Sequence, residues 1–366
     1  MEHGRISLGF AIAALLALPP PTARADTGAK IVEEVDFANS CSPAVQHEFK
    51  HAVWTLHSFW YPEALKDFTA VTEAEPNCAI GYWGIAMSNW YPLWYPPSPA
   101  ALKAGSEAVE KAMAAPTKTE REKDYIAAIA AFYRDNDKLD HRTRAVAYEK
   151  AMEQAYLKYP EDREAAVFYA LALDTTAPPT DKTYANQKQA ADILNKVWKE
   201  QPNHPGVVHY LIHSDDSARF AQAGLDAAIC YAKIAPDVPH ALHMPSHIFT
   251  RLGMWQESID SNRAANAAAL AYVRKTLGPE SLLAASIRWI ISNTPICRPR
   301  RTARPRLSSM SWQPFTRSAN PICPQLMPSL RSPRAMCSSA ATGRPPLLCR
   351  RRRSGFRSSA FRGPRR

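Results

Sequence analysis

The sequence predicts an all-α fold in which pairs of antiparallel helices follow one another as a repeat array. Three observations support this prediction. Prolines end successive helical patterns, and the interval from Pro202 to Pro236 is 34 residues, a length typical of helical-hairpin repeats. Small residues recur where two helices must approach closely. We find no sustained alternation of β-branched and polar residues, which a half-buried strand would require.

The first predicted helical pair shows the repeat pattern most completely. The helix over Phe49–Phe59 carries Ala52 where a small residue allows close packing of its neighbour. The next helix combines Ala64, Phe68 and Pro76: an alanine, a bulky residue four positions later, and a proline eight beyond that. Proline has no N–H to donate and cannot extend a helix, so this helix must end before Pro76.

Later helices are predicted from the same signals. They cover Cys78–Met87, Tyr148–Tyr159, Glu164–Leu173, Gln187–Glu200, Gly206–His213 and Gly224–Ala235. Pro160, Pro202 and Pro236 end three of them. Ile248–Ile259 repeats the turn that joins the two helices of a unit, and Tyr91–Pro99 and Thr175–Asp181 are predicted loops.

The N-terminus has the pattern of a secretory signal peptide covering residues 1–25. Met1–Arg5 carries positive charge, Ile6–Leu18 is an apolar run, and Ala23–Ala25 supplies the small residues that a signal peptidase reads. The run is too short for a permanent membrane-spanning helix, although an uncleaved N-terminal anchor is the alternative. We therefore expect an exported protein in the periplasm of a Gram-negative bacterium, without stable membrane insertion.

Export makes disulfides permissible. Cys41 lies just before the first helical pattern and Cys78 lies between the first and second helical pairs. A Cys41–Cys78 bridge would tie the N-terminal end of the array to the turn after its first repeat, and two buried thiols are the alternative. Cys230 lies in an apolar helical stretch and is expected in the core.

The formal net charge of +11 first suggests a nucleic-acid partner. Of the 45 basic residues, 18 are arginines in residues 284–366, a segment without lysine, aspartate or glutamate. Residues 1–283 therefore hold 27 basic and all 34 acidic residues, a net charge of −7. The predicted repeat domain, residues 26–283, is acidic, and we expect no nucleic-acid partner.

Residues 284–366 are rich in arginine, proline and serine and show no helical periodicity, so we expect a disordered tail that arises from an out-of-frame reading. Codons chosen for Trp289–Cys297 give DYLEYAYL after two bases are dropped, and the same shift across Ala335–Cys349 gives DVLERGDWAAAASL. Acids and amphipathic patterns return in that frame. A genuine basic tail for an anionic partner is the alternative.

Four strings resemble a bacterial family of exported tetratricopeptide-repeat (TPR) proteins. They are LHSFWYPEALKDF (Leu56–Phe68), NCAIGYWGIAMS (Asn77–Ser88), HPGVVHYLIHSDD (His204–Asp216) and PHALHMPSHIFTRLGMWQESI (Pro239–Ile259). The resemblance covers roughly residues 36–283 and implies a TPR-like α-solenoid. It supplies no biochemical role.

Histidine is the residue type with chemical potential. Six of the eleven lie close together in the sequence: His204, His209, His213, His240, His243 and His247. His209 and His213 share one face of a predicted helix, so several imidazoles converge if neighbouring helices face each other.

Neutral imidazole is a good ligand for transition metals. We therefore predict a zinc or copper site formed by His209, His213, His240, His243 and His247. Asp215 and Asp216 are expected to add an oxygen ligand or to orient an imidazole. Histidines used only for helix packing and capping are the alternative. The string HYLIH lacks the glutamate of the HExxH motif, so hydrolysis on that template is not predicted.

Aromatic residues form the second candidate feature. Trp90, Trp94 and Tyr95 near the predicted loop are a candidate ligand surface, whereas most other aromatics are expected to pack between helices. The sequence shows no convincing nucleophile arrangement and no phosphate-binding loop, so no catalytic residue is predicted. The first functional hypothesis is a periplasmic scaffold that binds a protein or peptide on a concave face. The alternative is a metal-binding protein or metalloenzyme.

Overall fold

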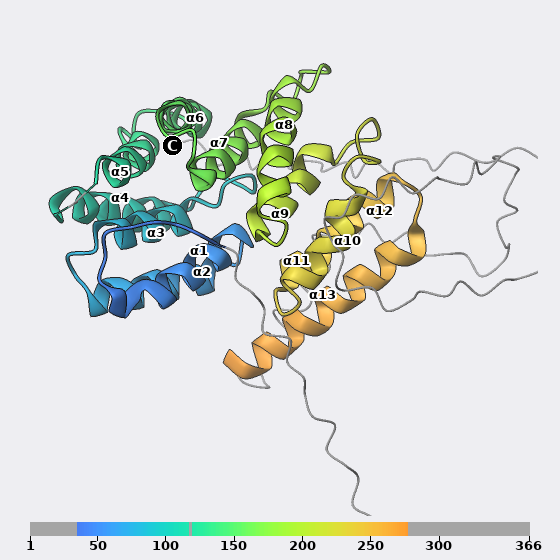
Figure 1. The fold of residues 1–366 in the computed structure, drawn as a ribbon, viewed down its shortest axis with the longest axis horizontal. Coiled ribbons are helices and arrows are strands. Elements are labelled where there is room, and N and C mark those ends of the chain that lie inside the picture. The colour runs from blue at the N-terminus through green and yellow to red at the C-terminus, as the bar shows by residue number, and fades with distance from the viewer. Residues whose placement is uncertain (1–34, 117–118, 277–366) are drawn as a thin grey trace, which may run out of the picture. The chain divides into compact units, whose positions relative to one another are not determined.

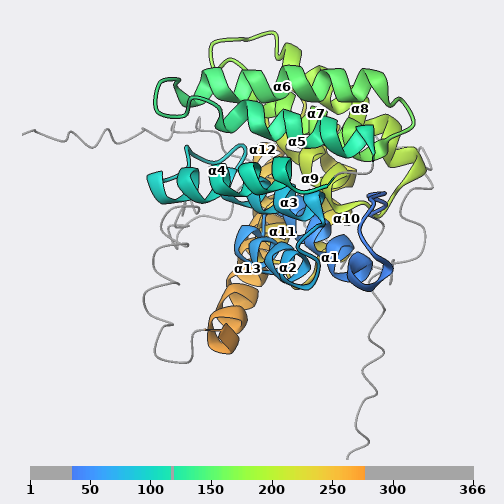
Figure 2. The ribbon, with the colours of Figure 1, turned by 90° about the vertical axis from the view of Figure 1, so that its left-hand side faces the viewer.

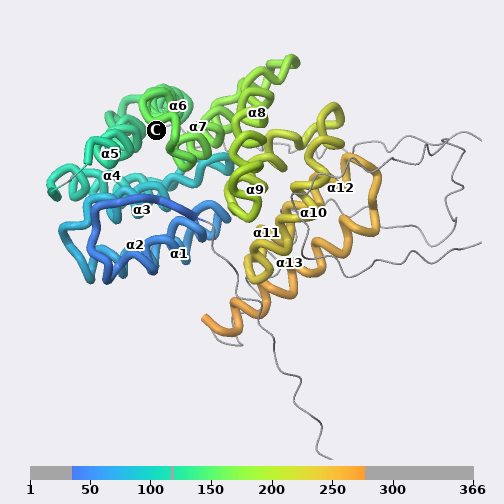
Figure 3. Tube along the Cα trace, viewed as in Figure 1, coloured from blue at the N-terminus to red at the C-terminus, as the bar shows by residue number. Residues whose placement is uncertain are grey.

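The computed structural model describes residues 35–116 and 119–276, and this part of the chain is α-helical without a β-strand. Figures 1 and 3 show the path of the chain. A 3-10 turn, η1 (Pro43–Val45), is followed by α1 (Gln46–His57), α2 (Tyr61–Ala74), α3 (Ala79–Trp90), α4 (Pro99–Ala114), α5 (Glu120–Tyr133), α6 (His141–Lys158), α7 (Arg163–Thr176), α8 (Ala185–Glu200), α9 (Pro205–Asp215), α10 (Leu225–Ile234), α11 (Pro239–His243), α12 (Pro245–Arg251) and α13 (Trp255–Thr276). The predicted all-α class is confirmed.

Each helix from α1 to α10 packs against the next one along the chain, and α11 and α12 both pack against α13 (Figures 1 and 2). Helix α1 also packs against α9, which lies far along the chain. The helix ends follow the prolines, because α2, α6, α8 and α10 all end two residues before a proline. Proline also occupies the first turn of α2, α4, α9, α11 and α12, where a missing N–H costs nothing.

Glycines permit the closest helix approaches. A Cβ atom on Gly84 in α3 would lie 2.3 Å from the Phe68 ring of α2. A Cβ atom on Gly206, in the first turn of α9, would lie 2.5 Å from the Nδ1 atom of His57. Glycine at position 206 therefore allows the start of α9 to reach the buried imidazole at the end of α1.

The segment before α1 is part of the core. Phe37 has no exposed surface and packs against Phe49, Trp83, Tyr125 and Phe168. Cys41 and Cys78 form a disulfide, with their Cα atoms 5.2 Å apart. The Ser40 N–H and hydroxyl both donate to Glu122 in α5. The disulfide therefore joins the start of α3 to the segment before α1, which is itself packed into the core.

Trp90 is not a surface residue, because it is only 1% exposed and packs against the rings of Phe132 and Tyr148. Its assignment to a ligand surface was wrong, whereas Trp94 and Tyr95 are 39% and 60% exposed. The predicted signal peptide, the end of the repeat domain at residue 283 and the predicted tail lie outside the described residues. Within the described ranges, no helix combines the length and the apolarity needed to cross a membrane.

We expect the Cys41→Ser/Cys78→Ser variant to unfold with a free energy lower by about 2–4 kcal/mol, since the bridge closes a loop of 37 residues and restricts the unfolded chain. Urea titrations of the oxidised protein and the variant measure the difference. Cys230→Ala is the control, because Cys230 is buried outside the bridge. Dithiothreitol should move the midpoint of the wild type and of the control, but not of the double variant. An unchanged wild-type midpoint would contradict the prediction.

Candidate functional site

Five imidazoles gather where α9 meets α11 and α12. His209 and His213 come from α9, His240 and His243 from α11, and His247 from α12. The Nε2 atom of His209 lies 3.0 Å from Nε2 of His240 and 3.2 Å from Nε2 of His213. We call these three residues the histidine triad. Their ligand atoms all lie within 4.8 Å of one another, so they could hold a metal ion.

His243 and His247 form a second contact beside the triad, which we call the histidine pair. Their Nε2 atoms are 3.1 Å apart. The ring centres of His213 and His247 are 6.3 Å apart, and those of His240 and His243 are 6.2 Å apart. The pair and the triad are thus direct neighbours.

Local sequence explains how the rings converge. His209 and His213 are four residues apart in α9, so their side chains lie on one face of the helix. His240 follows Pro239 in the first turn of α11, and Pro245 starts α12 directly after Met244. The short helices α11 and α12 both pack against α13, and α12 also contacts α9. These contacts direct three histidines from a segment of eight residues toward α9.

Hydrogen bonds at the Nδ1 atoms fix the tautomers of three rings. The Nδ1 atom of His209 lies 2.7 Å from the backbone oxygen of His57, the last residue of α1. Such a carbonyl has no partner inside its own helix and can only accept, so His209 carries its proton on Nδ1. The lone pair of its Nε2 atom consequently points toward His213 and His240.

The same reasoning applies to the histidine pair. The Nδ1 atom of His247 lies 2.8 Å from a carboxylate oxygen of Asp216, and Nδ1 of His243 lies 2.7 Å from Oδ1 of Asn262. The amide of Asn262 is oriented by its other end, because Nδ2 donates to the Ser258 carbonyl at 2.8 Å. Both rings therefore donate through Nδ1.

Burial keeps four of the five imidazoles uncharged at neutral pH. Burial first, and then repulsion from the neighbouring imidazoles, lowers the pKa of His209 and His240 well below the ordinary value of histidine. The same causes lower the pKa of His213 to about 3, and burial together with His247 lowers that of His243 to about 4. Neutral imidazole is the form that binds metal ions, so proton competition at neutral pH is weak.

Aromatic rings cover the triad on the side of α1 and α3. Phe59 is buried, and its ring centre lies 4.4 Å from that of His209, 5.7 Å from that of His213 and 5.6 Å from that of His240. Its backbone has a φ of 52°, which is uncommon for a residue with a Cβ. The partly exposed Trp94 contacts His240 edge to face at 5.2 Å. An apolar wall on one side strengthens the electrostatic interactions inside the cluster.

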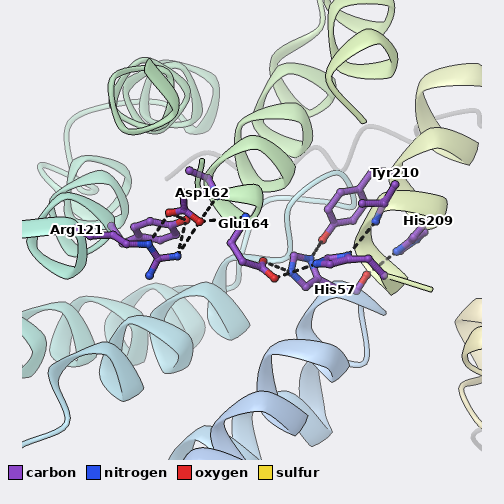
Figure 4. Close-up of polar contacts among 10 residues, drawn as sticks. His57, Arg121, Asp162, Glu164, His209 and Tyr210 are labelled. Carbon is purple, nitrogen blue, oxygen red and sulfur yellow. Dashed lines mark hydrogen bonds and ion pairs between the residues drawn. The ribbon is translucent and has the colours of Figure 1, made fainter. Parts of the chain in front are cut away.

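A second cluster lies deeper in the protein (Figure 4). Glu164 in α7 accepts from Nε2 of His57 at 2.8 Å and from Nε2 of His204 at 2.9 Å. The Nδ1 atom of His57 accepts from the Tyr210 hydroxyl at 3.0 Å, and Nδ1 of His204 accepts from the Val207 N–H at 3.3 Å. The side chains of His57, Glu164 and His204 each have 1% or less of their surface exposed.

The protonation states in this deeper network agree with its hydrogen bonds. Burial would raise the pKa of Glu164, but the imidazoles of His204 and His57 outweigh it and hold the pKa well below its usual value. Burial lowers the pKa of His57. A carboxylate between two neutral imidazoles that both donate needs no additional cation. Although His57, Glu164 and His204 could geometrically hold an ion, their hydrogen bonds already account for every proton and lone pair that faces the carboxylate.

The network continues from Glu164 to the N-terminus of α7. Asp162 caps this helix, and it pairs with Arg121 of α5 through a contact to the guanidinium Nε and a 2.9 Å contact to a terminal nitrogen. Tyr125 also donates to Asp162 at 2.9 Å. Burial alone would lower the pKa of Arg121, but Asp162 raises it above its usual value. The guanidinium thus remains charged inside the helical array.

The structure brings together the five histidines that the sequence analysis selected, but it divides them into the triad and the pair. His204, from the same sequence cluster, belongs to the deeper network. Asp216 contacts Nδ1 of His247, as expected for a residue that orients an imidazole. Burial raises the pKa of Asp215 to about 7. Sequence reasoning missed His57, Glu164 and Asn262, and no pattern in the sequence analysis pointed to them.

We expect the metal-free protein to lose stability in acid because of His213. The unfolded chain takes up a proton at His213 near pH 6.5, whereas the folded chain does so only near pH 3. The neutral folded form therefore stabilises the protein fully above pH 6.5, and this contribution is lost by about 1.4 kcal/mol per pH unit as the pH falls toward 3.

Urea titrations of wild type and His213→Leu between pH 7.5 and 4.5, both in EDTA, measure this contribution. Comparison with the variant removes opposing contributions from buried carboxyls such as Asp215. The stability advantage of the wild type should shrink by the stated slope below pH 6.5. His47→Ala, at an exposed position outside the cluster, should follow the wild type. Parallel pH profiles for wild type and His213→Leu would contradict the prediction.

Comparison with known proteins adds no name to this geometry: no model of a protein family matches the chain, and no curated protein sequence matches it either.

Proposed function

We propose that this protein binds a transition-metal ion, zinc or copper, at His209, His213 and His240. The observation that carries the proposal is the convergence of three Nε2 atoms, because that of His209 lies 3.0 Å from that of His240 and 3.2 Å from that of His213. The backbone oxygen of His57 accepts from Nδ1 of His209, so the lone pair of the His209 Nε2 atom points toward the other two rings. A neutral imidazole has one lone pair in the plane of its ring, so His209 cannot accept well from two neighbours at once. A single cation among the three atoms uses all three lone pairs.

The spacing supports a metal ion quantitatively. Nitrogen ligands lie about 2.0–2.1 Å from zinc, which places two ligands of a tetrahedral ion about 3.3 Å apart. The two Nε2 contacts of the triad are close to this value. The donor set contains nitrogen without sulfur, which suits zinc and copper(II). Three protein ligands leave one tetrahedral position for water or another ligand, as in catalytic zinc sites.

The surrounding scaffold is proposed to be a TPR-like α-solenoid, and the protein to be exported to the periplasm. Consecutive packing of helices that end before prolines supports the first point. The signal-peptide pattern of residues 1–25 and the Cys41–Cys78 disulfide support the second. We propose neither a nucleic-acid partner nor stable membrane insertion for the mature chain.

A protein or peptide partner is the second candidate function. Trp94 and Tyr95 are exposed and lie side by side with ring centres 6.3 Å apart, and Trp94 contacts His240. Aromatic anchors of this kind commonly provide binding energy at interfaces. The test is selection of a random peptide library on the protein, followed by binding of the selected peptides to Trp94→Ala. Equal binding to the variant would exclude this surface.

We expect the full-length protein, stripped with EDTA and then given zinc chloride, to retain zinc after dialysis. His213→Ala should lower the zinc affinity by at least about 10–100-fold, because loss of a ligand costs at least as much as loss of a residue that orients one. His213 is the preferred site, since it is partly exposed whereas His209 is completely buried.

Competition titration with a chromophoric chelator measures both affinities, and His47→Ala serves as the matched control. Circular dichroism must show that the His213→Ala variant keeps its helix content. If wild type, variant and control bind zinc equally, or if none of them retains it, the triad is not a zinc site.

A further inference from the structure

We propose that the ligand of the open coordination position is a small aromatic carboxylate, with its carboxylate on the metal ion of the triad and its ring against Trp94. This inference rests on the function proposed above. Its starting point is the contact between Trp94 and His240, whose ring centres lie 5.2 Å apart. Trp94 is 39% exposed, so an accessible indole lies beside one of the proposed metal ligands.

The burial of the triad shows from which side a ligand can reach the ion. His209 is completely buried, whereas His213 and His240 are partly exposed. A molecule from solution must therefore approach past His213 and His240. Because Trp94 contacts His240, its indole borders this approach.

The protein holds this indole in place. The Tyr61 hydroxyl donates to the Pro92 carbonyl at 3.3 Å, and the Trp94 N–H donates to the Tyr91 carbonyl at 3.2 Å. The Trp94 ring also meets the rings of Phe59 and Tyr61 edge to face, with centres 6.0 and 5.5 Å apart. A side chain that is already held loses little conformational entropy when a ligand binds to it.

The backbone around the indole adopts conformations that residues with a Cβ atom rarely adopt. Phe59, Tyr91 and Leu93 have φ angles of 52°, 58° and 68°. Within the described ranges, the other non-glycine residues with a positive φ are Asp135 and Tyr184. Such conformations cost free energy and cluster at sites that bind ligands. Their concentration here supports a binding surface rather than incidental packing.

The ion and the indole together select the class of ligand. Three neutral imidazoles leave the charge of the ion uncompensated, which favours an anion as the fourth ligand, and a carboxylate oxygen is a common ligand of zinc. The indole favours an aromatic ring, because aromatic pairs gain free energy beyond the burial of their surface. A cationic ring, which an indole also attracts, would be repelled by the ion. A carboxylate attached to an aromatic ring satisfies both groups.

Isothermal titration calorimetry of the zinc-saturated, full-length protein tests the inference, with phenylacetate, acetate and phenylacetamide as probes. Acetate has the charge without the ring, and phenylacetamide has the ring without the charge. We expect phenylacetate to bind on the order of 10-fold more tightly than either, because only phenylacetate engages both groups. Removal of zinc with EDTA should reduce its binding to the level of phenylacetamide.

A tryptophan variant separates the ring from the charge. Trp94→Ala, saturated with zinc, should bind phenylacetate about 10-fold more weakly and acetate as the wild type does. A merely structural role of Trp94 would weaken the binding of both anions equally. Trp255→Ala is the matched control, because it removes a tryptophan that is 59% exposed on α13, and it should bind all three probes as the wild type does.

The outcomes separate this inference from the proposed function. A wild type that retains no zinc overturns both. Retained zinc with equal affinities for phenylacetate and acetate overturns the inference and leaves the zinc site intact. Phenylacetate binding that EDTA or Trp94→Ala does not weaken places the aromatic carboxylate elsewhere and also overturns it. Zinc content and helix content, measured before each titration, confirm that every variant is loaded and folded.

Discussion

The contacts of one residue, His57, connect the deeper network to the candidate metal centre. Its side chain lies between Glu164 and Tyr210, and its backbone oxygen accepts from His209. Because His57 ends α1, its carbonyl needs a partner outside the helix, and His209 provides that partner. Gly206 makes the approach possible, since any Cβ atom there would collide with the imidazole. One buried residue thus joins α1, α7 and α9 and sets the tautomer of a proposed ligand.

Sequence patterns predicted the helices that end before prolines, because the physical causes are local, but they predicted neither α4 nor α5. Proline ends a helix because it has no N–H to donate, and a spacing of four residues places His209 and His213 on one face of α9. Contacts such as His57 to Glu164, 107 residues apart, depend on the packing of whole helices and have no short-range signature. The burial of Trp90 depends in the same way on α5 and α6, which supply its neighbours Phe132 and Tyr148.

The two histidine clusters contain similar residues but differ in where the acceptors of their hydrogen bonds lie. In the deeper network each imidazole donates to Glu164 and accepts at its other nitrogen, so every lone pair and proton facing the carboxylate has a partner. In the triad, the oxygen acceptor of His209 lies outside, and the lone pair of its Nε2 atom points toward His213 and His240. A buried polar group normally finds a partner for each of its donors and acceptors. The inward lone pair of His209 is therefore the feature that distinguishes the proposed binding site from the structural network.

Charge balance gives the proposed centre a further property. Imidazole ligands are neutral, so an ion in the triad keeps its full positive charge. Asp216 carries a carboxylate in contact with the cluster, and it is already shared between His247 and Arg251. Glu164 is separated from His209 by His57 and is shared between two imidazoles. The protein therefore compensates little of the metal charge, and an anionic ligand from solution would be favoured at the open coordination position over a neutral one of the same size.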